Sequence, residues 1–197
     1  MNRRTFLATA SASVFAAMLP ASAFALSDAQ AKNLVDRAVA DINKVISSGN
    51  SLSGMIRDFE RIFVTYADVP VIARSALGAD ARRATSAQLS AYTKAFQGYI
   101  ARKYGKRFEE FVGGQIEVQG ARRVKSFHEV QTVAKLRGEA PFAVNFLVSD
   151  KSGKPRFFDM IIEGISLRLS EKEEIGAMLD RRKGDIDLLT QDLKKAG

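Results

Sequence analysis

Cysteine and tryptophan are absent from this 197-residue chain, and it contains one histidine, His128. Without cysteine the chain can form no disulfide, no thiolate metal site and no cysteine nucleophile. A single histidine cannot supply a multi-histidine metal site. The composition therefore excludes thiol chemistry and histidine-rich metal centres, and we expect no metal site and no cofactor.

Catalytic motifs are also lacking. No serine lies in a G-x-S-x-G elbow, and no glycine-rich phosphate loop or cluster of metal ligands occurs. His128 and Glu129 could act as a base and its orienting partner, but their polar surroundings favour a surface histidine. Asp159 and Glu163 would lie roughly 13 Å apart along one strand face, too far for a catalytic pair, so a solvated edge or salt bridges are favoured. We predict no catalytic residues; an enzyme using Asp159 or His128 as a base is the alternative.

The chain carries an excess of positive charge. The formal net charge is +8, and the first 25 residues contribute only Arg3 and Arg4, which leaves +6 for the remainder. A basic surface favours an anionic partner, whether nucleic acid, membrane headgroups or an acidic protein patch. Charge alone does not choose among these three.

Residues 1–25 have the pattern of a cleaved export signal. Arg3 and Arg4 precede an apolar run too short to span a bilayer, and small residues lead to a cleavage site before Leu26. The adjacent arginines followed by Phe-Leu favour twin-arginine export, with an ordinary secretory signal as the alternative. The mature chain, residues 26–197, is then a single domain that acts outside the bacterial cytoplasm, and a nucleic-acid partner is not expected.

The hydrophobic pattern changes once along the chain. Before residue 113 apolar residues recur at helical spacing, and Ser27–Gln30 and Thr85–Gln88 have the form of capping boxes. After residue 113 they alternate, and short turns separate four predicted strands, which indicates an antiparallel sheet. A third capping box, Ser170–Glu173, predicts a helix after the sheet. Helices followed by strands predict an α+β fold.

Residues 157–167 are the strongest strand signal. Large apolar side chains occupy both alternating faces, so neither face can be freely exposed to water. Yet Asp159 and Glu163 share one of these faces. We predict a strand covered by helices on one side and by helices or an apolar ligand on the other.

Several spaced motifs resemble the MlaC family, also called the toluene-tolerance or auxiliary transport component family. The resemblance covers residues 30–195 and rests on Phe59-x-x-Ile62-Phe63-x-x-Tyr66-x-Asp68, Ile72-Ala73-Arg74-x-x-Leu77-Gly78, Ala84-Thr85-x-x-Gln88, Tyr104, Phe158-Asp159-x-x-Ile162-Glu163-Gly164-Ile165-Ser166-Leu167 and Gly184-x-Ile186-x-x-Leu189-x-x-Leu193. After Leu167 the chain departs from the Tyr-Arg pair and aromatic residue usual in the family. The hopanoid-associated branch, HpnM, is therefore an alternative within it.

The resemblance implies a periplasmic lipid carrier. Such a protein shuttles phospholipid between an outer-membrane MlaA-like lipoprotein complex and an inner-membrane Mla-type ABC transporter with its MlaD-like component, a pathway tied to outer-membrane lipid asymmetry. The implied fold has helices wrapped on a curved four-stranded antiparallel sheet, in the outline of nuclear transport factor 2-like domains, around an apolar cavity. The cargo would be phospholipid or, on the HpnM alternative, a hopanoid.

Apolar residues from both halves of the chain are expected to contact the lipid tails. Those from the helical half are Ile62, Phe63, Tyr66, Ile72, Leu77, Tyr99, Tyr104 and Phe108. Those from the strands are Val144, Phe146, Phe158, Met160 and Ile162.

Overall fold

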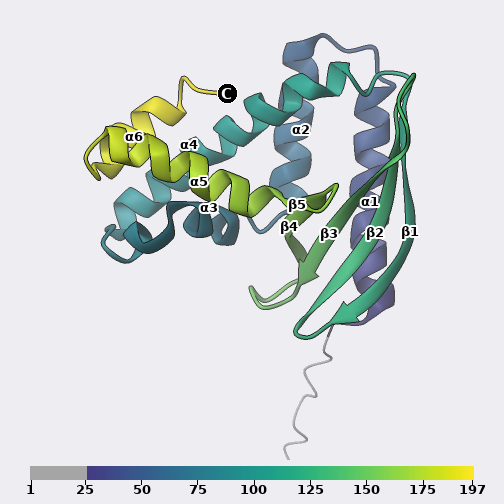
Figure 1. Cartoon of the computed structure of the whole chain (residues 1–197), viewed down its shortest axis with the longest axis horizontal. Helices are drawn as coiled ribbons and strands as arrows, with labels where there is room; N and C mark the ends of the chain where they lie inside the picture. Colours follow the sequence, from purple (N-terminus) through teal and green to yellow (C-terminus); the bar gives the residue numbers. More distant parts are fainter. Residues whose placement is uncertain (1–25) are drawn as a thin grey trace, which may run out of the picture.

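A computed structural model describes residues 26–197 of the chain. In these residues an α-helical half precedes a β-sheet, and two helices close the chain (Figure 1). The α-helices are α1 (Asp28–Ile46), α2 (Leu52–Tyr66), α3 (Val69–Leu77), α4 (Ser86–Gly105), α5 (Leu167–Arg181) and α6 (Ile186–Leu193); the 3-10 helices are η1 (Gly78–Arg82) and η2 (Lys106–Glu109). The predicted export signal, residues 1–25, lies outside the described residues.

The sheet is an antiparallel meander in which each strand pairs with the next. Its strands are β1 (Gln115–Val124), β2 (Phe127–Lys135), β3 (Phe142–Ser149), β4 (Arg156–Ile162) and β5 (Ile165–Ser166). The prediction of an α+β fold is confirmed, but four strands is wrong by one. Glu163 and Gly164, both at positive φ, turn the chain back, so that two further residues pair with β4.

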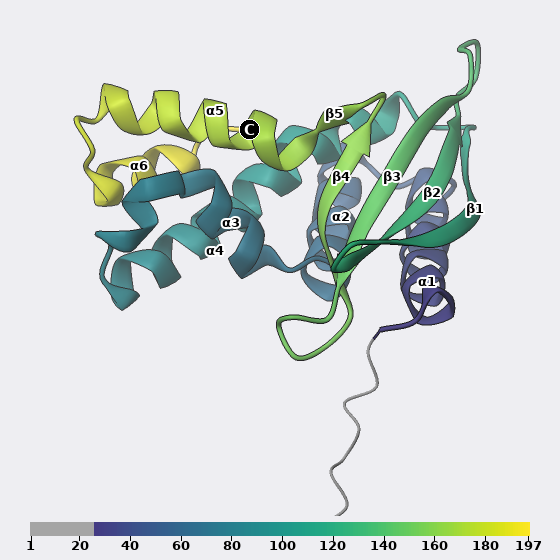
Figure 2. The same cartoon turned by 60° about the horizontal axis from the view of Figure 1, so that its bottom comes forward.

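The helices form two groups (Figures 1 and 2). Helices α1 and α2 lie on one face of the sheet, where α1 packs along β1 and β2. Helices α3, α4, α5 and α6 pack on one another beside the sheet, and α2 contacts α4. The two groups together bury one hydrophobic cluster that includes residues of every helix and of β1 to β4.

Two of the three predicted capping boxes are confirmed. The side chains of Ser27 and Thr85 cap α1 and α4, with Gln30 and Gln88 completing the reciprocal bonds. The third is wrong: α5 begins at Leu167, and its N-cap is Ser166. Ser170 lies one turn inside the helix, where its hydroxyl donates to the carbonyl of Ser166.

A β-bulge interrupts the alternation predicted for residues 157–167. Leu147 pairs with Asp159, but Val148 pairs with Phe157, so one extra residue of β4 lies between these pairs. Phe157 therefore points to the helix-covered face, where its ring lies 5.3 Å from that of Phe146. Phe158 points the other way.

The space between the helices and the sheet is filled by side chains. The largest fully buried ones include five aromatic residues, Phe63, Tyr92, Phe96, Tyr99 and Phe146. The enclosed apolar cavity expected from the family resemblance stays a prediction, because the hollows described below open to solvent. No helix within residues 26–197 is both long enough and apolar enough to cross a membrane.

Candidate functional site

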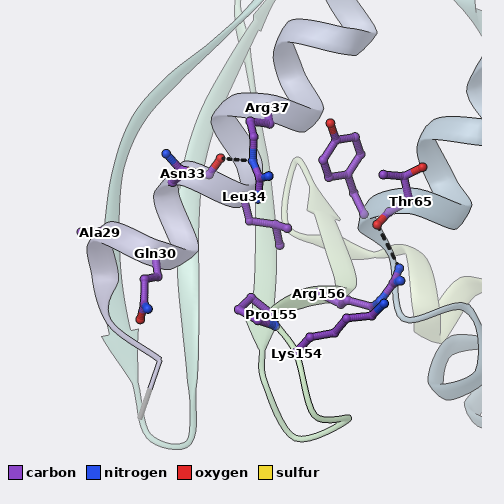
Figure 3. Close-up of a pocket in the computed structure, with 10 residues that line it drawn as sticks. Ala29, Gln30, Asn33, Leu34, Arg37, Thr65, Lys154, Pro155 and Arg156 are labelled. Atoms are coloured by element: carbon purple, nitrogen blue, oxygen red, sulfur yellow. Dashed lines mark hydrogen bonds between the residues drawn. The ribbon is translucent and has the colours of Figure 1, made fainter. Parts of the chain in front are cut away.

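One hollow lies where the first turns of α1, the end of α2 and the β3–β4 hairpin meet (Figure 3). Its volume is about 540 Å³. Leu34 and Tyr66 form part of its wall, and both side chains continue into the hydrophobic cluster. Its full lining is Ala29, Gln30, Asn33, Leu34, Arg37, Thr65, Tyr66, Lys154, Pro155 and Arg156.

Three cations line this hollow, and none of its lining residues is acidic. Arg37 comes from α1, and its Nε donates to the carbonyl of Asn33 at 3.4 Å. Lys154 comes from the hairpin. Arg156, at the start of β4, donates from Nη1 to the carbonyls of Val64, Thr65 and Ala67 at 2.8–3.0 Å and so binds the end of α2. The hollow is therefore positively charged.

A second hollow, of about 370 Å³, continues along the groove between α1 and α2. It shares Thr65 and Tyr66 with the first. Between them the hydroxyl of Tyr66 donates to Oδ2 of Asp41 at 2.7 Å and so joins the two helices. We call the line along which α1 faces α2 in these hollows the α1–α2 seam.

The structure brings together twelve of the thirteen predicted tail-contacting residues. Nine are buried in the hydrophobic cluster, and Tyr104, Met160 and Ile162 pack against it half-buried. The exception is Phe158, whose ring packs edge-on against Phe127, 5.6 Å away, on the opposite face of the sheet. Phe157 takes the inward place beside Phe63 and Phe146. Strict alternation along the strand from Met160 and Ile162 would place Phe158 on the helix-covered face. The bulge shifts the strand by one residue, so that Phe157 lies on that face instead.

Two of the predicted aromatic residues belong to a polar cluster rather than to plain apolar wall. Glu171 is fully buried, and its Oε1 accepts from the Tyr104 hydroxyl at 2.6 Å and from Lys103 Nζ at 2.8 Å. Lys103 Nζ also lies 3.1 Å from the Tyr99 hydroxyl. Burial, with the nearby Glu171, raises the pKa of both tyrosines well above its ordinary value. Both hydroxyls thus stay neutral.

His128 is buried, and the prediction of a surface histidine is wrong. Its Nδ1 lies 2.6 Å from Oδ1 of Asp28, in the first turn of α1. The inward-facing side of β2 places the ring under α1, and Asp28 supplies the polar partner that a buried imidazole needs. The pair fastens α1 to the sheet.

Asp159 is also buried, so a solvated strand edge is wrong for it, whereas the predicted salt bridge is present: Arg168 Nε lies 3.7 Å from its Oδ2. Its Oδ1 accepts from the backbone N–H of Arg168 at 2.9 Å, and its Oδ2 accepts from the Ser166 hydroxyl at 2.6 Å. It thereby holds the start of α5. Glu163 lies in the exposed turn after β4, away from the strand face predicted to hold both acids.

Neither His128 nor Asp159 lines the seam. Residues 26–197 contain no group of three or more histidine or carboxylate side chains that could hold a metal ion. What the first hollow offers chemically is three cations beside apolar side chains.

One solved structure shares this fold over most of its length. It is that of a phospholipid-binding protein from Ralstonia solanacearum in complex with a phospholipid, with a TM-score of 0.71 and 20% sequence identity over 84% of this chain and 95% of that one. A family model described as MlaC protein matches residues 32–195. Because this match spans most of the chain, the protein belongs to the MlaC family.

Proposed function

We propose that this protein is a periplasmic lipid carrier that encloses the acyl tails of a phospholipid between its helices and its sheet. The observation that carries the proposal is the MlaC family match over residues 32–195. The phospholipid bound by the Ralstonia protein of similar fold supports the same cargo here. The predicted export signal supports the periplasmic location.

Tail burial is a physical requirement for any such carrier. Each methylene exposed to water costs about 0.8 kcal/mol, so a 16-carbon tail left in water would cost on the order of 12 kcal/mol. In this structure the aromatic and aliphatic side chains of the cluster occupy the interior. Tails must therefore enter by displacing side chains, and the α1–α2 seam is the route we propose, because its hollows reach buried Leu34 and Tyr66.

The partners we propose are those of the family: an MlaA-like complex at the outer membrane and an Mla-type ABC transporter with an MlaD-like component at the inner membrane. A hopanoid in place of the phospholipid is the alternative cargo, because the chain departs from the usual family pattern after Leu167. No cofactor beyond the lipid cargo is proposed.

The test is to identify lipid in the purified protein. Native mass spectrometry should show one lipid-bound species, and solvent extraction should release phospholipid; extracted hopanoid would favour the alternative. A well-folded protein that carries no lipid and takes none up from vesicles would contradict the carrier.

A pair of variants separates tail binding from general damage to the sheet. Ile162→Asp places a charge beside the hydrophobic cluster and should abolish lipid retention. Ala143→Asp places the same charge on an exposed position of the neighbouring strand and should leave retention unchanged. Circular dichroism establishes that both variants fold.

A further inference from the structure

We propose that the hollow between α1, α2 and the β3–β4 hairpin holds the phosphate of the lipid headgroup. The inference rests on the proposed carrier function and assigns to it a headgroup site. Three cations line the hollow and come from two separate parts of the sequence: Arg37 lies on α1, and Lys154 and Arg156 lie at the end of the β3–β4 hairpin (Figure 3). Three cations without an acidic residue in the lining suit an anion.

The backbone adds to this positive field. Ala29, Gln30 and Asn33 belong to the first two turns of the 19-residue helix α1 and line the same hollow. The N-terminal end of a helix carries a partial positive charge that favours phosphate. At the opposite side the partial negative charge of the α2 C-terminus is met by the Arg156 guanidinium, which binds three of its carbonyls.

Two carboxylates of α1 near the hollow already have polar partners. Asp28, which precedes the lining residue Ala29, has its Oδ1 2.6 Å from Nδ1 of His128. Asp41, beyond Tyr66, accepts from the Tyr66 hydroxyl and lies 3.0 Å from Lys44 Nζ. Both carboxylates are therefore engaged away from the three cations.

The floor of the hollow identifies the source of the phosphate. Leu34 and Tyr66 are buried, and Pro155 adds further apolar surface. A free phosphate ion gains nothing from such a floor, whereas a phospholipid places its first methylenes directly below its phosphate. The hollow thus places cations next to apolar side chains, as a phospholipid places its phosphate next to its acyl chains.

The experiment compares a lipid that carries a phosphate headgroup with one that carries none. Purified full-length mature protein is incubated with vesicles that contain phosphatidylglycerol or diacylglycerol with the same acyl chains, and lipid uptake is measured. The variant R37Q/K154Q removes two cations of the hollow and leaves Arg156, which holds the end of α2. The control K32Q/K151Q removes two cations from the same helix and hairpin, outside the hollow.

We expect R37Q/K154Q to weaken phosphatidylglycerol uptake about tenfold, since hydrogen bonds to charged groups are lost, and to leave diacylglycerol uptake unchanged. The control variant should match the wild type with both lipids. An equal loss for both lipids, or an equal effect of the control, would overturn the headgroup site while the carrier function stands. Uptake of neither lipid by the wild type would overturn both. If inorganic phosphate alone displaced the bound phospholipid, the site would be one for free phosphate, and the lipid assignment would be wrong.

Discussion

The Tyr66 hydroxyl and the Asp41 carboxylate form a 2.7 Å hydrogen bond that closes the α1–α2 seam between its two hollows. This hydrogen bond, together with Lys44, holds the pKa of Asp41 below its ordinary value. Burial, with the bond to Asp41, raises the pKa of Tyr66. The bond thus connects one buried side chain of α2 to one half-exposed side chain of α1.

Tyr66→Phe should loosen the seam and accelerate lipid transfer several-fold. The loss of one hydrogen bond should cost about 0.5–1.5 kcal/mol of folding free energy. Because the folded-state pKa of Asp41 is depressed, its contribution to stability is present above its unfolded pKa and is lost as the pH falls through the folded pKa. The stability gap between wild type and variant should therefore narrow in acid, below about pH 4.

Thr65→Val is the matched control. Thr65 lines both hollows, but its hydroxyl donates to the Arg61 carbonyl within α2 and does not reach α1. Transfer rates come from fluorescent-lipid exchange between vesicles, and the Asp41 pKa comes from nuclear magnetic resonance titration. An unchanged Asp41 pKa in Tyr66→Phe would argue against the bond in solution.

Asp159→Ala should destabilise the protein by about 2–4 kcal/mol, because it removes hydrogen-bond acceptors from the start of α5 and the carboxylate that pairs with the Arg168 guanidinium. Its side chain is 2% exposed and binds two backbone N–H groups and the Ser166 hydroxyl. Asp159→Asn should restore part of this loss. Ser170→Ala, at the helix start that the sequence pattern favours, should cost less than about 0.5 kcal/mol. Denaturant unfolding measures all three, and equal losses for Asp159→Ala and Ser170→Ala would contradict the role of Asp159 in holding the start of α5.

Glu171→Ala should cost about 1–3 kcal/mol, because it takes a buried acceptor away from its two hydrogen-bond partners. Those partners are the Lys103 ammonium and the Tyr104 hydroxyl. Glu171→Gln preserves an acceptor and should cost less. The matched control is Glu173→Ala, an exposed position on the same helix. Similar midpoints for Glu171→Ala and Glu173→Ala in urea would contradict the buried cluster.

The sequence predicted the start of a helix where that start depends on neighbouring residues alone. Ser27 and Thr85 cap the helices that follow them, since both partners of each capping box lie within four residues. The start of α5 could not be found in this way, because it also depends on Asp159, which lies on strand β4. Local alternation likewise misplaced Phe158, since the bulge arises from pairing between β3 and β4. A histidine in a polar stretch gives no local sign of the α1 residue that covers it.

The candidate site was predictable in part for the same reason. Helical spacing and the family resemblance identified Ile62, Phe63 and Tyr66, all of which lie inside. The basic hollow went unrecognised, because Arg37 lies more than a hundred residues before Lys154 and Arg156 in the sequence and lines the same hollow only in the fold. No sequence pattern links Lys154 and Arg156 to Arg37.

Alkaline pH should unfold the protein in one steep transition rather than titrate its tyrosines gradually. Burial raises the pKa of all four tyrosines, Tyr66, Tyr92, Tyr99 and Tyr104. A group whose folded pKa is raised contributes stability below its unfolded pKa, and that stability is lost as the pH rises above it, here above about pH 10.

The chain lacks tryptophan, so ultraviolet absorbance reports tyrosinate directly. In the folded protein tyrosinate absorbance should stay low above pH 10 and then rise together with the loss of helical circular dichroism. Protein unfolded in guanidinium provides the control and should ionise gradually around pH 10. Gradual ionisation near that pH with native circular dichroism would show that the hydroxyls are exposed, and the burial of Tyr92 and the hydrogen bond of Tyr104 to Glu171 would then be wrong.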